Sequence, residues 1–106
     1  MGSEALRGAT TASSNTAIGY TSLSSNTTGN FNTGLGRNAL NANTTGQQNT
    51  AIGYATLNLN TSGYDNTSIG YGSLNLNTTG FNNTALGSRS LFSNTTGNSN
   101  TAVGYI

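Results

Sequence analysis

The sequence predicts an all-β fold, a parallel β-solenoid of about six 17-residue turns. The first observation is an Asn-Thr pair that recurs every 17 residues with no insertion or deletion. The second is that each unit carries two glycines and two aliphatic residues at fixed positions. The third is a short alternating segment, T-A-I-G-Y in the first complete unit, which is typical of a strand. Each unit is too small to bury its own apolar face, so the units are expected to stack.

The repeat divides the chain into three parts. Residues 1–3 are interpreted as an artificial start rather than a targeting segment, and residues 4–14 as a degenerate partial repeat. Residues 15–106 form five full repeats and a truncated sixth, with the consensus N-T-A-[IL]-G-Y-x-S-L-x-x-N-T-T-G-x-x. Repeat positions below are numbered along this consensus, from its first asparagine.

Two aliphatic columns are the predicted core. They are Ile18, Leu35, Ile52, Ile69, Leu86 and Val103 at position 4, and Leu23, Leu40, Leu57, Leu74 and Leu91 at position 9. Their spacings of five and twelve residues do not sustain a helical stripe of period 3.6. Each turn is therefore expected to hold two short strands and two corners. The N-T-T-G segment supplies a corner, because Asn and Gly tolerate left-handed backbone conformations.

Asparagine occupies two further columns. They are Asn15, Asn32, Asn49, Asn66, Asn83 and Asn100 at position 1, and Asn26, Asn43, Asn60, Asn77 and Asn94 at position 12. Stacking turns about 4.8 Å apart places like residues over one another. The side-chain amides are therefore expected to hydrogen-bond along the stack as asparagine ladders.

The predicted core is thin for a single chain. Two buried aliphatic side chains per turn contribute about 2–3 kcal/mol each, whereas ordering the backbone costs about 1–2 kcal/mol per residue. Small residues at positions 3 and 5, such as Ala17 and Gly19, allow close approach of another backbone. We predict self-association along this face. The alternative is that these small residues fit a narrow interior.

Composition limits the classes of function. Charged residues make up 5% of the chain and its net charge is +1, so no binding surface for nucleic acid is indicated. No apolar run approaches the roughly 20 residues needed for membrane insertion. The chain lacks His and Cys, and its only carboxylates are Glu4 and Asp65. We therefore expect no catalytic residues, no metal site, no cofactor and no enzymatic activity.

Aromatic and threonine columns suggest surface roles. Tyr20, Tyr54 and Tyr71 are candidate surface contacts for a glycan or protein receptor, but packing over the coil or between chains is the favoured interpretation of their column. Phe81, at a variable position, is a candidate surface contact for a partner. Threonine pairs such as Thr27-Thr28 raise the possibility of ice binding. Adjacent residues of a strand point to opposite faces, however, which disfavours it. A third alternative is a self-assembling filament, because uncapped solenoid ends expose pairing edges.

The N-T-A-I-G unit resembles the head repeat of YadA-type trimeric autotransporter adhesins. The longer N-T-A-I-G-Y-x-S-L-x-x-N-T-T-G unit is similar to β-roll repeats of phage tail fibres. The resemblance covers residues 5–106, and its best copies are residues 15–29 and 49–63. It implies a left-handed β-roll, a homotrimer, and display outside the cell or on a virion. The expected function is a structural or adhesive segment excised from a longer surface fibre.

Overall fold

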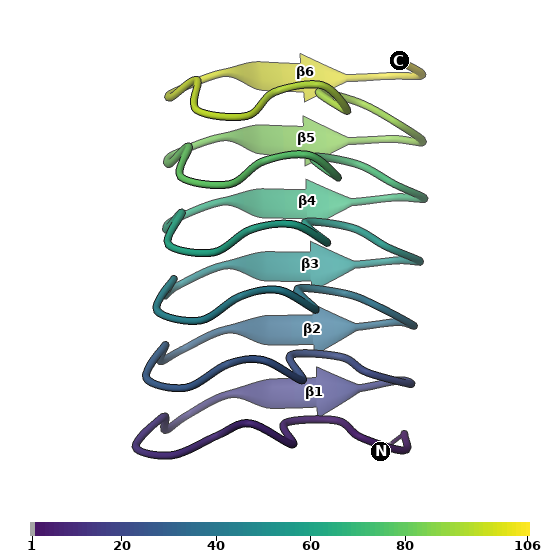
Figure 1. Cartoon of the computed structure of the whole chain (residues 1–106). Helices are drawn as coiled ribbons and strands as arrows, with labels where there is room; N and C mark the ends of the chain where they lie inside the picture. Colours follow the sequence, from purple (N-terminus) through teal and green to yellow (C-terminus); the bar gives the residue numbers. More distant parts are fainter. Residues whose placement is uncertain (1) are drawn as a thin grey trace.

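The computed structural model describes residues 2–106, which form a rod of stacked turns with extents of 33 × 21 × 17 Å (Figure 1). We call each 17-residue turn a coil. Each coil contributes one strand: β1 (Thr16–Ile18), β2 (Thr33–Leu35), β3 (Thr50–Ile52), β4 (Thr67–Ile69), β5 (Thr84–Leu86) and β6 (Thr101–Val103). The strands form one parallel sheet in chain order, and every residue pairs with the residue 17 positions on. The predicted all-β solenoid and its period are confirmed.

The second half of each coil contains no strand, which differs from the prediction of two strands per turn. Its backbone still bonds from coil to coil: Leu57 N–H donates to Ser73 C=O at 3.1 Å. The leucine at position 9, however, has a left-handed backbone, with φ of 50° at Leu57. Tight turns flank it, such as Asn60 N–H to Leu57 C=O at 3.2 Å. This alternation of turns replaces the extended backbone that a strand requires.

The structure reverses the predicted orientation of the strands. The alternation is correct, but position 3 points into the coil: Ala17, Ala51 and Ala85 are buried against the leucine column. Position 4, predicted as core, lies on the outer face. Ile18, Leu35, Ile69 and Val103 are 45%, 38%, 39% and 76% exposed, and Ile52 and Leu86 are half-buried. The physical reason is the width of the coil interior. Because the position-9 leucine already fills most of it, the strand on the opposite wall has room only for small side chains.

The leucine column is therefore the main apolar core. Leu23, Leu40, Leu57 and Leu74 are fully buried, and Leu91 is half-buried against them. Position 3 faces the interior of the coil, as the alternative of a narrow interior predicted, so it is not available to a partner. The position-5 glycines of all but the last coil are half-buried beside the next coil. Small hydroxyl side chains complete this interior. The Ser22 hydroxyl, for example, donates to the carbonyl of Gly34 at 2.9 Å inside the coil.

Both asparagine columns hydrogen-bond along the stack. At position 12, each Nδ2 donates to the Oδ1 of the preceding coil at 2.8–2.9 Å. At position 1, each Oδ1 accepts the backbone N–H of the next asparagine at 2.8–3.0 Å. The two columns meet on the position-15 glycine, since Asn49 and Asn60 both donate to the Gly63 carbonyl, at 2.8 and 3.0 Å. These bonds satisfy amides that burial would otherwise destabilise.

Two glycine columns are needed for different reasons. Gly53, at position 5, has φ of 132°, and a Cβ there would lie 2.8 Å from the carbonyl oxygen of Gly70 in the next coil. A Cβ on Gly63, at position 15, would lie 2.3 Å from Asn60 Oδ1 and 2.5 Å from the Gly80 carbonyl oxygen. Side chains at these two columns would therefore separate the coils.

The first coil extends further toward the N-terminus than the repeat suggested. The prediction began the partial repeat at residue 4, but the Ser3 carbonyl accepts the Thr21 N–H at 3.1 Å, so residues 2–14 all belong to the stack. Ala5 and Leu6 pack on the leucine core. Met1, part of the predicted artificial start, lies outside the described residues.

Candidate interaction surfaces

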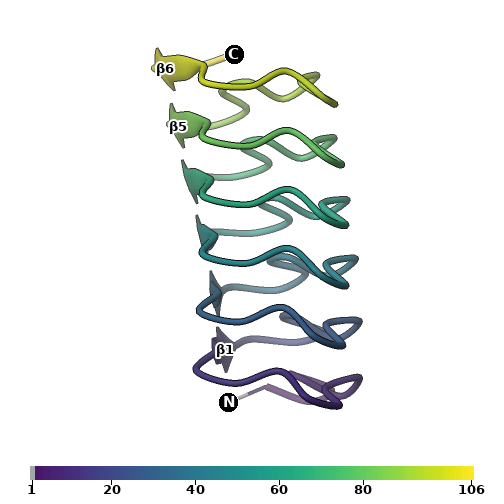
Figure 2. The same cartoon turned by 90° about the vertical axis from the view of Figure 1, so that its left-hand side faces the viewer.

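The outer face of the sheet is the first candidate surface, and we call it the sheet face. Its strands lie above one another along one side of the rod (Figure 2). It presents the position-4 aliphatic row beside the threonines of position 2, and none of the six strands contains a charged residue. The threonines are Thr16, Thr33, Thr50, Thr67, Thr84 and Thr101. A long exposed apolar row of this kind is typical of a contact site.

The threonine pairs after the position-12 asparagine are arranged differently. The hydroxyl groups of Thr27, Thr44, Thr61 and Thr78 each donate to a backbone carbonyl of the next coil, at 3.1–3.2 Å. These first threonines of the pairs therefore hold the coils together, whereas the second threonines are exposed outside the strands: Thr28, Thr45, Thr79 and Thr96. The threonine row within the strands lies on the sheet face, where ice binding was not predicted.

The second candidate surface is the position-6 column, which we call the tyrosine edge. Tyr54 and Tyr71 stack with ring centroids 5.3 Å apart and planes 9° apart. The Arg37 guanidinium lies over the Tyr20 ring, 5.4 Å from its centroid. Predicted surface residues Tyr20, Tyr54 and Tyr71 are exposed. The stacking of Tyr54 on Tyr71 agrees with packing along the coil, the interpretation that the sequence favoured for this column.

A second aromatic stack lies elsewhere on the coils. Tyr64 and Phe81 stack with centroids 4.8 Å apart and planes 4° apart. Phe81 was predicted as a surface contact and is half-buried in this stack. Tyr64 was not linked to it, although both residues occupy position 16 and their spacing of 17 residues predicts the contact.

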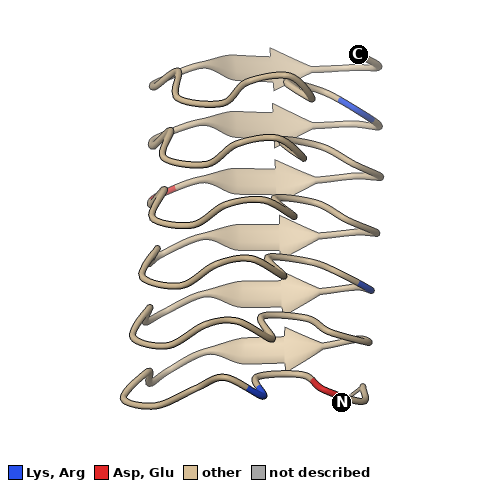
Figure 3. Cartoon of the chain, in the orientation of Figure 1, with Lys and Arg blue, Asp and Glu red and all other residues tan. Residues whose placement is uncertain are grey.

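Charged groups are few and scattered along the rod (Figure 3). Glu4 and Arg7 pair with each other in the first coil at 3.3 Å. Arg89 lies over the Phe92 ring, 5.4 Å from its centroid. Two of the three arginines therefore rest on aromatic rings, where the ring face stabilises the cation.

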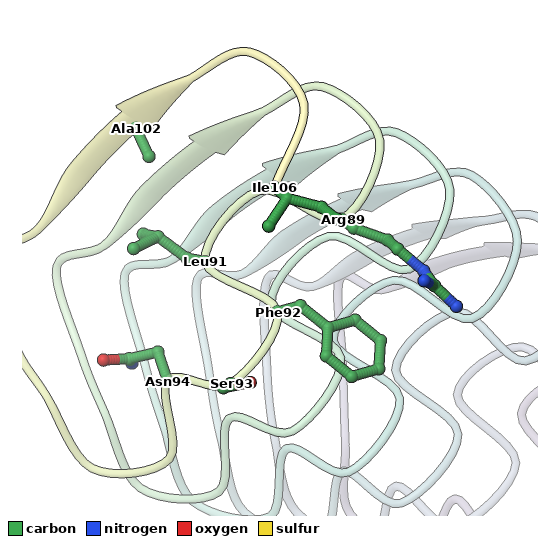
Figure 4. A pocket seen from close by; sticks show the side chains of 7 residues that line it. All are labelled: Arg89, Leu91, Phe92, Ser93, Asn94, Ala102 and Ile106. Atoms are coloured by element: carbon green, nitrogen blue, oxygen red, sulfur yellow. The ribbon is translucent and has the colours of Figure 1, made fainter.

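A hollow of about 390 Å³ lies over the last coil. In Figure 4, Leu91, Asn94 and Ala102 line its inner part, whereas Arg89 and Phe92 lie at an outer corner. In earlier coils the equivalent space holds the leucine of the following coil, as Leu74 lies over Leu57. The hollow is therefore a continuation of the core rather than a separate site.

Residues 2–106 contain no group of three or more His, Cys, Asp or Glu side chains that could hold a metal ion. Within the same range, no helix has the length and apolar character needed to cross a membrane. Comparisons of the chain with protein-family models, with curated proteins and with solved structures gave no match. The case for a function therefore rests on the surfaces described above.

Proposed function

We propose that the chain is a structural and adhesive segment of a multi-chain surface fibre, with no catalytic role. The observation that carries this proposal is the aliphatic row of the sheet face, which runs over all six strands and stays at least partly exposed among residues 2–106. We propose that a second copy of the chain covers this aliphatic row. The face carries no charge, so like-charge repulsion does not oppose the contact of identical surfaces.

The energetics favour such an assembly. Completing the burial of a half-exposed aliphatic side chain contributes about 1 kcal/mol, and each copy offers six of them. The chain's own core contains one large aliphatic residue per coil, because alanine, serine and glycine occupy the opposite wall. Contact between copies thus adds a second apolar layer comparable to the first.

The resemblance to YadA-type heads and tail-fibre repeats supports three copies around one axis, wound left-handed and displayed outside the cell or on a virion. In this arrangement the sheet faces meet at the axis and the tyrosine edge stays accessible to a receptor. The asparagine ladders hold every coil in register, so the assembly would transmit load along its length as a rod.

Light scattering of the whole 106-residue chain at micromolar concentration tests the proposal. We expect three times the 10.7 kDa chain mass. The double variant Ile52→Thr, Ile69→Thr keeps β-branched residues in the strands and should be monomeric with an unchanged circular dichroism spectrum. Leu59→Thr is the matched control, because Leu59 is 41% exposed but lies outside the sheet face. A folded wild-type monomer would exclude the assembly, and micrographs of growing particles would indicate an open filament instead.

Ice binding is a second candidate, supported by the threonine row of the sheet face. Hydroxyl and methyl groups of β-branched threonine recur there at the strand spacing, about 4.8 Å. Such a regular array can order water over its surface. Thermal hysteresis measures this activity directly, and Thr50→Val with Thr67→Val should abolish it. The same face cannot serve both functions at once, so a monomer with hysteresis would favour ice and a trimer without it would favour the fibre.

A further inference from the structure

We propose that the step between Tyr71 and Ser88 on the tyrosine edge binds one pyranose ring that carries a carboxylate, an acidic monosaccharide unit. This inference names a receptor class for the adhesive role and rests on that proposed function. It comes from an interruption of the aromatic column, beside one of the chain's three arginines.

Tyr71 has one ring face covered and one open. The stack with Tyr54 occupies the first face. On the other side the neighbour in the column is Ser88, whose single hydroxymethyl group is too short to cover a phenol ring. Tyr71 is accordingly 54% exposed, compared with 44% for Tyr54. The C–H groups on one face of a pyranose are attracted to the negative face of an aromatic ring.

The step has room for a sugar ring. The next aromatic residue of the column is Tyr105, two coils from Tyr71, which corresponds to about 10 Å at the strand spacing. A ring inserted between two others needs about 3.5–4.0 Å on each side, or about 7–8 Å in total. The equivalent gap between Tyr20 and Tyr54 is occupied, because Arg37 fills it and rests on Tyr20.

The charge beside the step selects an acid. Arg89 follows Ser88 directly and is exposed. Its side chain and Phe92 lie beside Gly72, the neighbour of Tyr71: a Cβ built on Gly72 would be 3.8 Å from Arg89 Cγ and 3.6 Å from the Phe92 ring. The base of the Arg89 side chain is therefore beside the step, whereas its guanidinium lies over the Phe92 ring, 5.4 Å from the ring centroid. The proposal requires the guanidinium to leave that ring on binding, when it can pair with a sugar carboxylate in two parallel hydrogen bonds.

The hydroxyl groups of the sugar also find partners. Ser88 is half-buried between the coils of Tyr71 and Tyr105, and Tyr54 and Tyr71 are exposed, so their hydroxyl groups are the candidate partners. A pyranose combines an apolar face for Tyr71, hydroxyls for these groups and a carboxylate for Arg89. A simple aromatic acid would use the ring and the arginine but leave the hydroxyls without partners.

Titration of the full chain with sodium glucuronate, followed by nuclear magnetic resonance, tests the proposal. We expect saturable binding with a Kd in the millimolar range and shifts confined to residues around Ser88, with glucose at least tenfold weaker. Ser88→Tyr continues the aromatic stack through the step and should abolish binding. Gln47→Tyr is the matched control, because it adds a ring at position 16, beside the Tyr64–Phe81 stack and away from the step.

Arg89→Gln tests the contribution of the guanidinium separately from that of the Tyr71 ring. It should weaken glucuronate about tenfold and leave the affinity for glucose unchanged. Equal binding of glucose and glucuronate by the wild type, or full binding by Ser88→Tyr, would overturn the proposal. The molecular mass of each sample, measured by light scattering, distinguishes a failure of the sugar site from a failure of the fibre proposal. A trimer that binds no glucuronate refutes this site alone, whereas a monomer that binds glucuronate refutes the fibre alone.

Discussion

Replacing Asn60 by alanine tests whether the asparagine ladder stabilises the rod. Asn60 is fully buried in the middle of its column. Its Nδ2 donates to Asn43 Oδ1 at 2.8 Å and to the Gly63 carbonyl at 3.0 Å, and its Oδ1 accepts from Asn77 Nδ2 at 2.8 Å. The variant loses all three hydrogen bonds, and the Asn43 Oδ1 is left without its ladder donor.

The expected loss follows from these contacts. Each hydrogen bond contributes about 1 kcal/mol, and a buried acceptor without a partner costs about 1–3 kcal/mol. The Gly63 carbonyl retains its bond from Asn49, and Asn77 Nδ2 retains its bond to the Gly80 carbonyl, so neither adds a further penalty. We expect Asn60→Ala to lower the free energy of unfolding by about 4–6 kcal/mol, a large part of the stability of a domain this size.

Asn94→Ala is the matched control at the end of the same column. Asn94 is half-buried, donates to Asn77 Oδ1 and the Gly97 carbonyl, and has no position-12 asparagine above it among the described residues. Its replacement removes two hydrogen bonds and the donor to Asn77 Oδ1, which water can replace at this half-buried end of the column, and should cost about 2–3 kcal/mol. Urea unfolding followed by circular dichroism measures both variants at equal protein concentration. Equal losses in the two variants, or a loss below about 1 kcal/mol for Asn60→Ala, would refute the ladder as a stabilising element.

Three further predictions address the glycine columns, the core and the ladder chemistry. Gly53→Ala should prevent stable folding or cost more than about 3 kcal/mol because its Cβ meets the next coil. Gly72→Ala, whose Cβ has no neighbour closer than 3.6 Å, adds only the strain of a left-handed residue at φ 62° and should cost about 1–2 kcal/mol in thermal unfolding. Leu57→Ala should cost about 2–5 kcal/mol and Ile69→Ala less than about 1 kcal/mol in the monomeric background, and the reverse order would contradict the orientation of the strands. Asn60→Asp places a carboxyl group where a donor is needed, which raises its pKa in the folded state. Its stability should therefore be highest below the unfolded pKa, about 4, and fall as pH rises through the folded pKa. Urea midpoints at several pH values, compared with wild type, would show no such fall if the site were solvated.

Much of the fold was predictable because the repeat is exact. A period of 17 residues without a break places Asn43, Asn60 and Asn77 in one column under any stacked arrangement, so the ladder followed from the sequence. The same period predicts contacts between aromatic residues that share a position, such as Tyr54 with Tyr71. Since these features depend only on which residues lie one coil apart, they need no knowledge of the path of the chain within a coil.

The direction of each side chain within the coil was decided by the tertiary structure. Alternation places Ala51 and Ile52 on opposite faces but does not say which face is inside. The large Leu57 side chain crosses a narrow interior and leaves space opposite only for Ala51, so Ile52 turns outward. The restriction of position 3 to alanine, serine and glycine was the available signal, because an outward column tolerates larger residues. Sequence therefore determined which residues stack, and the width of the coil determined which of them are core and which remain for a partner.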